Sequence, residues 1–481
     1  MSAAAGVAVV LTAPGSASAC GPEFPNQLLV SGDEVVLAAP VATFRLEIER
    51  IKPPLLLPFR SVTPTNERLY TWVFLQQTAD ADLADLQAAI HNSTLSADQC
   101  DALVADYGVA REALRKYAES RWASTERMIR WEQGWTWTPD PPPQPQWPQI
   151  HVPKELPAEF AYYLRGAIAY HRGRVQWART AWQRVLNLPP EQRHYRSTWA
   201  AFMIGKTCLQ DDPSKTAGWF ARVRELASQG FSDSLGLAAS SLGWEAQVEL
   251  DRKNYERAIE LYLAQNASGD PTAMTSLLLA AGRASRSDPP VLERLARHAT
   301  ARQVITAYII SRESDLSELT KSWLAAIESV GTRDMAGADR FAWAAYKGGD
   351  MEAARRWLDR ATDRSPTAQW VRAKLLLREG KMDAAAKLLA KLVRNFPDNE
   401  DWSGAYKSCS PWPWWLNRPT PQQVSGELGV LQLARGQYAD ALDLLLRGGY
   451  GLDAAYVAER VLAPNELIAY VNRCWPKSET A

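Results

Sequence analysis

The most regular part of the sequence reads Ser241-Leu-Gly-Trp-Glu-Ala-Gln-Val-Glu-Leu-Asp-Arg-Lys-Asn-Tyr-Glu-Arg-Ala-Ile-Glu-Leu-Tyr262. Small and apolar residues recur in it at helical spacing, with Ala258 twelve positions after Ala246 and four before Tyr262. Two antiparallel helices approach closely only where side chains are small, and a large side chain fills the space beside them. The stretch therefore predicts two packed helices.

The same arrangement recurs along the chain. Each copy has a small residue, an alanine twelve positions later and a large apolar residue four positions further on: Gly166/Ala178/Trp182, Ala246/Ala258/Tyr262, Ala342/Ala354/Leu358, Ala373/Ala385/Leu389 and Gly429/Ala441/Leu445. A glycine five residues before the alanine marks a turn in four copies, at Gly173, Gly349, Gly380 and Gly436. Proline closes three copies, at Pro190, Pro366 and Pro397, and a weaker copy runs through Gly205, Ala217 and Ala221.

This pattern resembles the tetratricopeptide repeat over residues 158–460. The resemblance implies an all-α fold, a right-handed superhelix of helix pairs that binds partners on a concave surface and rarely does chemistry. The copies are unevenly spaced, whereas the family unit has about 34 residues, so we expect irregular helix pairs between Pro271 and Arg340. Chance periodicity in an alanine-rich helical chain is the alternative.

The rest of the chain divides around this array. Residues 20–130 are predicted to form a smaller, mostly helical N-terminal region, in which Ser96 and Gln99 make a capping box before a helix over 96–127. Residues 131–157 are expected to be a Trp/Pro-rich linker or strap, because eight prolines between Pro139 and Pro157 exclude a helix. Residues 451–462 are predicted to form a capping helix. Residues 461–481 are expected to be the C-terminal cap and tail.

Residues 1–19 are similar to an export signal. An apolar run from Ala3 to Ala13 leads into Ala17-Ser18-Ala19, a small-x-small cleavage pattern directly before Cys20. No Lys or Arg precedes the run, so a merely apolar N-terminus is the alternative. Cys20 is either acylated, as in bacterial lipoproteins, or paired in a disulfide. Residues 20–26 and 451–462 also resemble segments of large secreted repeat proteins of Gram-negative bacteria, which implies the periplasm, outer membrane or cell surface.

Composition and motifs point away from nucleic acids and cofactors. Lys+Arg and Asp+Glu are both 54, so no excess of positive charge suggests a phosphate-tracking surface. Gly205-Lys206-Thr207 fits a loose phosphate-loop pattern, but it follows a helical run where such a loop needs a strand. The five cysteines and five histidines are scattered. We therefore expect no catalytic, cofactor or metal residues, and an enzyme with a site assembled only in three dimensions is the least favoured alternative.

Tryptophan is unusually abundant, with 20 Trp against 10 Phe. Nine lie in the predicted repeats, where packing between helices explains most of them: Trp177, Trp182, Trp199, Trp219, Trp244, Trp323, Trp343, Trp357 and Trp370. Others surround proline-rich loops: Trp131, Trp135, Trp137, Trp147, Trp412, Trp414 and Trp415. These are either loop plugs and straps or an aromatic platform for a protein or a sugar.

The sequence thus favours a non-enzymatic, exported or cell-envelope scaffold that binds a protein or peptide. Its groove is predicted to be lined by Arg165, Glu245, Arg372 and Gln432. A glycan-binding surface protein that uses the loop tryptophans is the alternative. We expect no cofactor and no nucleic acid partner, and membrane attachment only through lipidation of Cys20.

Overall fold

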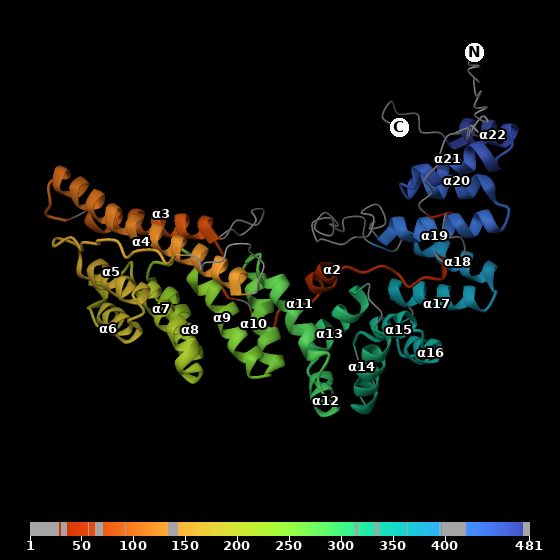
Figure 1. Cartoon of the computed structure of the whole chain (residues 1–481). Coiled ribbons are helices and arrows are strands. Elements are labelled where there is room, and N and C mark those ends of the chain that lie inside the picture. Colours follow the sequence, from red (N-terminus) through yellow and green to blue (C-terminus); the bar gives the residue numbers. More distant parts are fainter. Residues whose placement is uncertain are drawn as a thin grey trace, which may run out of the picture. The chain divides into compact units, whose positions relative to one another are not determined.

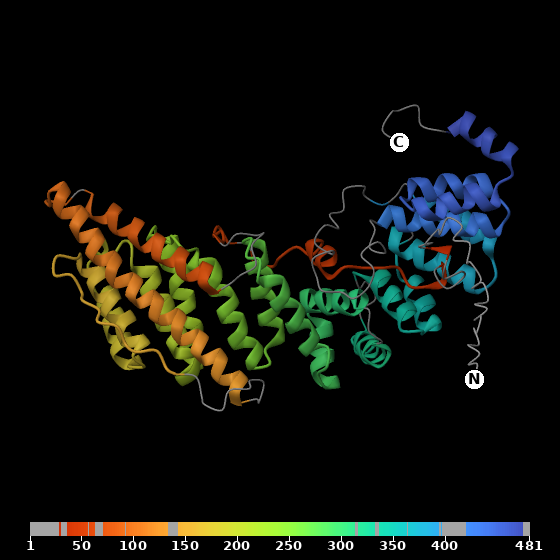
Figure 2. The same cartoon turned by 45° about the horizontal axis from the view of Figure 1, so that its top comes forward.

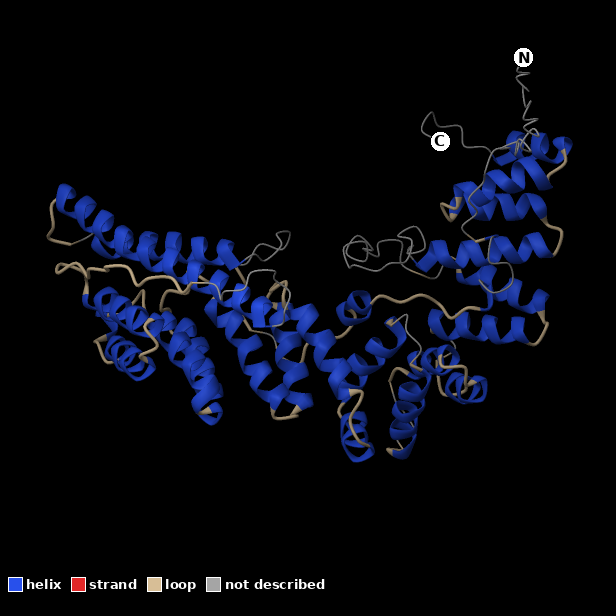
Figure 3. Ribbon diagram, viewed as in Figure 1, coloured by secondary structure: helices blue, strands red, loops and turns tan. Residues whose placement is uncertain are grey.

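The computed structural model describes residues 28–29, 36–55, 57–62, 71–91, 93–132, 143–312, 316–331, 336–362, 364–393, 396 and 420–474. All regular structure in these residues is helical, and they contain no strand (Figure 3). The all-α prediction is confirmed. The chain divides into unit 1 (Met1–Leu46 with Arg333–Ala481) and unit 2 (Glu47–Thr332). None of the described helices is long and apolar enough to cross a membrane.

Unit 2 begins with a long helix pair. Helices α3 (Thr71–Ile90) and α4 (Ala97–Glu132) lie side by side (Figures 1 and 2). The predicted capping box is present at the start of α4. The Ser96 amide donates to Gln99 Oε1 over 2.9 Å, and the Gln99 amide donates to Ser96 Oγ over 3.3 Å. Short helix α2 (Phe44–Glu49) spans the boundary between the two units.

Three regular helix pairs follow in unit 2, and consecutive pairs stack on one another (Figure 1). They are α5 (Ala158–His171) with α6 (Val175–Leu186), α7 (Ser197–Asp211) with α8 (Pro213–Ser228), and α9 (Leu237–Asp251) with α10 (Tyr255–Ala267). A 3₁₀ turn, η2 (Pro190–Gln192), connects the first two pairs.

The expected irregularity after the third pair is real. The next helices are α11 (Ala273–Ala284), α12 (Pro289–Arg297), α13 (Ala299–Ser311) and α14 (Ser317–Ser329). Helix α13 packs on both α10 and α11, and α12 packs on α14, so simple nearest-neighbour pairing is lost.

Regular pairing returns in unit 1. Its pairs are α15 (Ala338–Lys347) with α16 (Met351–Leu358), α17 (Pro366–Arg378) with α18 (Met382–Leu392), and α19 (Thr420–Ala434) with α20 (Tyr438–Arg447). The predicted capping helix is α21 (Gly451–Tyr456), which continues into a π-helical turn, η5 (Val457–Val461), before α22 (Pro464–Cys474).

Small residues face large ones where paired helices cross, as the repeat pattern requires. Trp182 is fully buried, and a Cβ placed on Gly166 would lie 2.3 Å from its Nε1. A Cβ on Gly429 would lie 3.1 Å from Leu445. The remaining repeat tryptophans divide into two groups: Trp199, Trp323, Trp343, Trp357 and Trp370 are buried, whereas Trp219 and Trp244 are half-buried. Trp177 is 72% exposed, so packing does not account for it.

The predicted turn residues all have left-handed backbone. Gly173, Gly349, Gly380 and Gly436 have φ between 73° and 83°. The copy without a turn glycine has Lys253 at the same position, with φ 61°. The turn geometry is therefore common to all five copies, and one copy forms it with a residue that rarely adopts this conformation.

The proline-rich segment is a strap where it is described. Helix α4 extends to Glu132, so Trp131 belongs to its last turn rather than to the linker. Beyond it, Trp147 packs on Tyr117 with ring centroids 4.7 Å apart, and the Arg172 guanidinium lies 4.6 Å from the Trp147 ring. The segment thus covers the α4 and α5 side of unit 2.

The contact between Gly166 and Trp182 predicts opposite effects for two glycine substitutions. Gly166→Ala should destabilise unit 2 by about 1–3 kcal/mol, because the new methyl group overlaps the indole. Gly218→Ala, in exposed α8 with no neighbour within 4 Å, should be neutral or stabilise by up to about 1 kcal/mol. Urea unfolding measures both. Equal effects of the two substitutions would contradict this packing.

Candidate functional site

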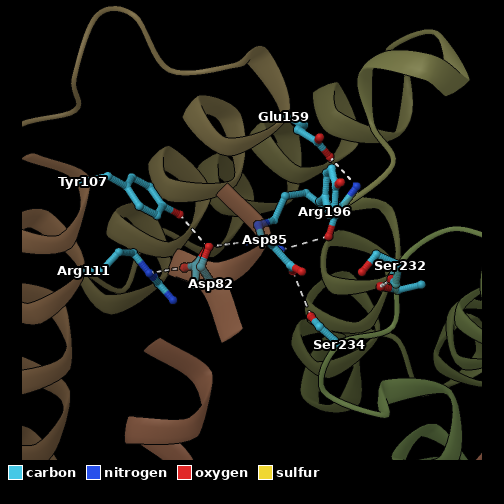
Figure 4. A network of polar contacts seen from close by, with 10 residues as sticks. Asp82, Asp85, Tyr107, Arg111, Glu159, Arg196, Ser232 and Ser234 are labelled. Atoms are coloured by element: carbon cyan, nitrogen blue, oxygen red, sulfur yellow. Dashed lines mark hydrogen bonds and ion pairs between the residues drawn. The ribbon is translucent and has the colours of Figure 1, made fainter. Parts of the chain in front are cut away.

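The densest group of ionisable side chains lies in unit 2, where α3 and α4 meet the first repeats (Figure 4). Arg196, just before α7, donates to Asp82 Oδ1 over 2.5 Å and to Asp85 Oδ2 over 2.7 Å. Asp82 also accepts from the Tyr107 hydroxyl over 2.8 Å and is ion-paired with Arg111. The two aspartates of α3 are therefore bound to two arginines from other elements.

This network is internal to the protein. Asp82 and Arg196 are fully buried, and the Arg196 guanidinium lies 4.3 Å from the ring centres of both Phe160 and Trp199. Glu159 accepts from the amides of Tyr195 and Arg196, while burial raises its pKa to about 7. Each charge faces a partner within the group. We conclude that the network is a clamp that fixes α3 and α4 on the repeats.

A second polar arrangement, in unit 1, holds a segment near the N-terminus of the chain itself, in which Val36 and Leu37 are helical and residues 38–40 are not. Residues 36–40 lie against the first helices of the repeats (Figure 1). Their carbonyl oxygens accept hydrogen bonds from four side chains of α15 and α17. Lys374 Nζ donates to Val36 over 2.9 Å, Tyr346 Oη to Leu37 over 2.6 Å, Arg378 Nη2 to Leu37 over 3.3 Å and Trp343 Nε1 to Pro40 over 3.1 Å.

Helical spacing brings these donors into one row. Trp343 and Tyr346 are three residues apart on α15, and Lys374 and Arg378 are four apart on α17, so each pair shares a helix face. Arg378 Nε also donates to Tyr346 Oη over 2.9 Å, which links the two helices. We call Trp343, Tyr346, Lys374 and Arg378 the donor row.

The strongest charge interaction of the donor row is buried. Lys374 is 1% exposed, and its ammonium lies 2.6 Å from Glu427 Oε1 on α19. Trp370 Nε1 donates to the other Glu427 oxygen over 2.8 Å. Burial lowers the pKa of Lys374 and raises that of Glu427, while each charge opposes the shift of the other. The Val36 carbonyl thus completes the coordination of an ammonium group that has little access to water.

The same stretch of chain is also held through its amide groups. The N–H groups of Leu28 and Leu29 both donate to Asp453 Oδ1 over 3.0 Å, and Asp453 is fully buried in α21. Unit 1 therefore binds backbone donors of residues 28–29 and backbone acceptors of residues 36–40. Side chains add to these contacts, since Leu28 and Val36 are buried in one hydrophobic cluster with residues of α19 to α22.

The predicted groove residues are divided between the units, with Arg165 and Glu245 in unit 2 and Arg372 and Gln432 in unit 1. Arg165 is exposed on α5, 5.8 Å from the Tyr162 ring. Glu245 is 6% exposed and is ion-paired with Arg224 over 2.5 Å and with Arg257 over 3.3 Å, so it belongs to a cluster between helices.

The other two groove residues are in unit 1, and both are half-buried. Arg372 precedes Lys374 by two positions and so points away from the donor row. Gln432, on α19, accepts from Arg435 Nη1 over 2.5 Å.

The other predicted site residues are only partly covered. The backbone of Trp131 is helical, and Trp135, Trp137, Trp412, Trp414, Trp415 and Cys20 lie outside the described residues, as does the signal-like segment. The described cysteines Cys100, Cys208 and Cys474 are free thiols. Gly205, Lys206 and Thr207 lie within α7. No group of three or more metal-ligating side chains occurs in the described parts of the chain.

The donor row and its bound segment were missed by the sequence reasoning. One signal was available. Arg372 and Lys374 are the only charged residues between Val371 and Leu377, and a lysine buried among apolar side chains requires a partner. Nothing in the repeat pattern points to residues 36–40 as that partner.

The clamp predicts a large effect for one arginine. Arg196→Met should destabilise unit 2 by about 3–5 kcal/mol, because it leaves Asp85 buried without its cation. Arg297→Met, which removes an exposed pair with Glu293, should cost less than about 1 kcal/mol. Urea unfolding followed by circular dichroism compares the two. Similar midpoints would show that the clamp contributes little.

Comparison with known proteins gives one family match. A model of the tetratricopeptide repeat matches residues 340–400, which contain α15 from its third residue, all of α16 to α18, and the donor row. No curated protein matches the chain. The match covers two of the copies found from the alanine pattern, and the paired helices continue on both sides of it. The chain is a helical repeat protein of the tetratricopeptide-repeat-like type.

Proposed function

We propose that this protein is a non-catalytic scaffold that binds a short segment of a partner protein on the first helices of its repeats. The observation that carries the proposal is the donor row, which holds residues 36–40 through their backbone carbonyls. A surface that binds backbone groups in this way can accept a segment from another chain. The tetratricopeptide match over the same helices also favours protein binding.

The scaffold proposal predicts where a partner contacts the chain. A photo-crosslinking amino acid replaces Arg165 on α5 or Arg378 on α17, two exposed first-helix positions. Matched controls replace Arg356 on α16 and Lys387 on α18, two exposed second-helix positions. Irradiation in the native host should link one protein to the first-helix positions only. Crosslinks at the control positions alone, or at none of the four, would contradict the proposal.

We also propose that the chain is exported to the bacterial cell envelope. The support is the sequence of residues 1–19, with Ala17-Ser18-Ala19 directly before Cys20. The mass of the protein recovered from the native host should correspond to a chain that starts at Cys20, with or without acyl groups on that residue. A cytoplasmic protein that retains residues 1–19 would rule out export. The glycan-binding alternative rests on Trp131, of which only the backbone is described, and on five tryptophans outside the described residues, so it gains no support from the geometry.

A further inference from the structure

An open cavity of about 440 Å³ lies at the surface between α6, α7 and α8 of unit 2. Its volume is in the range of small-molecule sites. Ile204, Cys208 and Trp219 form an apolar wall, and Arg179, Arg184 and Lys215 bring three cationic groups to the polar side. Because α6 and α8 are the second helices of their pairs, the cavity is separate from the first-helix positions considered above.

Two of these cations already have carboxylate partners. Arg179 Nη2 lies 2.9 Å from Asp211 Oδ2, and its Nε donates to Thr207 Oγ1 over 2.9 Å, so its guanidinium is fixed at the edge of the cavity. The Lys215 ammonium lies 2.6 Å from Asp212 Oδ2. Hydrogen bonding to Lys215 lowers the pKa of Asp212 to about 2, which keeps that carboxylate ionised.

Arg184 is the third cationic residue of the cavity. It is exposed, and within the described residues its guanidinium has no carboxylate partner and rests only near the Tyr162 ring, 6.0 Å from its centre. The cavity and its immediate ion pairs therefore carry one positive charge in excess. One anionic group on a ligand would neutralise it.

The apolar wall indicates the rest of the ligand. Trp219 is half-buried between two hydrophobic clusters, so its ring forms a fixed surface beside Ile204. An aromatic or aliphatic body would pack there, while a charged group reaches Arg184 at the opening. Shape and charge are thus complementary to a molecule with one apolar part and one negative charge.

We propose that this cavity binds a small organic acid with a single carboxylate on an aromatic or aliphatic body. The carboxylate accepts hydrogen bonds from Arg184, whose planar guanidinium suits bidentate binding, and Arg179 and Lys215 add longer-range attraction. The body packs against Trp219 and Ile204. This binding is independent of the scaffold function, so either can fail without the other.

The test titrates the full chain with benzoate, phenylacetate, indole-3-acetate and hexanoate, each beside its neutral primary amide, and follows binding by ligand-detected NMR. At least one acid should bind about tenfold more tightly than its amide, because the amide lacks the charge-assisted hydrogen bonds. Slower amide hydrogen exchange at the end of α6 and the start of α8 should locate that binding in the cavity.

Two arginine variants make the test specific. Arg184→Gln should weaken the acid about tenfold and leave the amide unchanged. Arg165→Gln is the matched control, because its guanidinium also lies beside the Tyr162 ring, at 5.8 Å, but does not line the cavity. It should bind the acid as the wild type does. The proposal is overturned if no acid binds at about 5 mM, if acids and amides bind equally, or if both variants behave alike.

Discussion

The structure depends on one constraint: paired helices approach closely only where a small residue of one helix lies opposite a large residue of the other. Gly166 admits the Trp182 indole so closely that even a methyl group would overlap it. Where the small residue is alanine, as at Ala342 opposite Leu358, the side chains are again buried. These contacts join residues close in sequence, so each helix pair is built locally and the array can tolerate the irregular stretch from α11 to α14.

Elements outside the repeats are held by long-range contacts, in which buried charged groups act beside hydrophobic clusters. In unit 2, Arg196 holds α3 and α4 on the repeats through Asp82 and Asp85. In unit 1, Lys374 binds a carbonyl more than 300 positions away in the sequence, and Asp453 binds two amides even further away. Both units therefore use buried charged groups where an element outside the repeats must be fixed. A buried charge that loses its partner is costly, which makes these contacts specific.

The sequence correctly predicted the features that depend on residues close together in the chain. The helix pairs, the turn position of Gly349 and the capping box at Ser96 are all present. It failed where a residue's neighbour comes from elsewhere in the chain. Glu245 was predicted to line the groove because it is a charged residue of a first helix, but it forms ion pairs with Arg224 and Arg257 from adjacent helices.

The candidate site was missed for the same reason. The alanine pattern fixes which helix pairs with which, but it contains no information on a segment outside the repeats. Residues 36–40 are held through main-chain atoms, and Val36 is also buried in a hydrophobic cluster, but an apolar side chain does not specify the helices on which it packs. Trp177 is an error of the opposite kind. Its place in a predicted helix suggested that its side chain packs between helices, but the side chain is exposed.

Amide hydrogen exchange of the full chain tests most directly whether the repeats hold residues 28–29 and 36–40 by their backbone. The Leu28 and Leu29 amides, which donate to buried Asp453, should exchange at least about tenfold more slowly than in an unstructured peptide. Tyr346→Phe, which removes a donor to the Leu37 carbonyl, should speed exchange in the segment around residues 36–46, whereas Tyr438→Phe on exposed α20 should not. Exchange of Leu28 and Leu29 at the rate of an unstructured peptide would contradict the account.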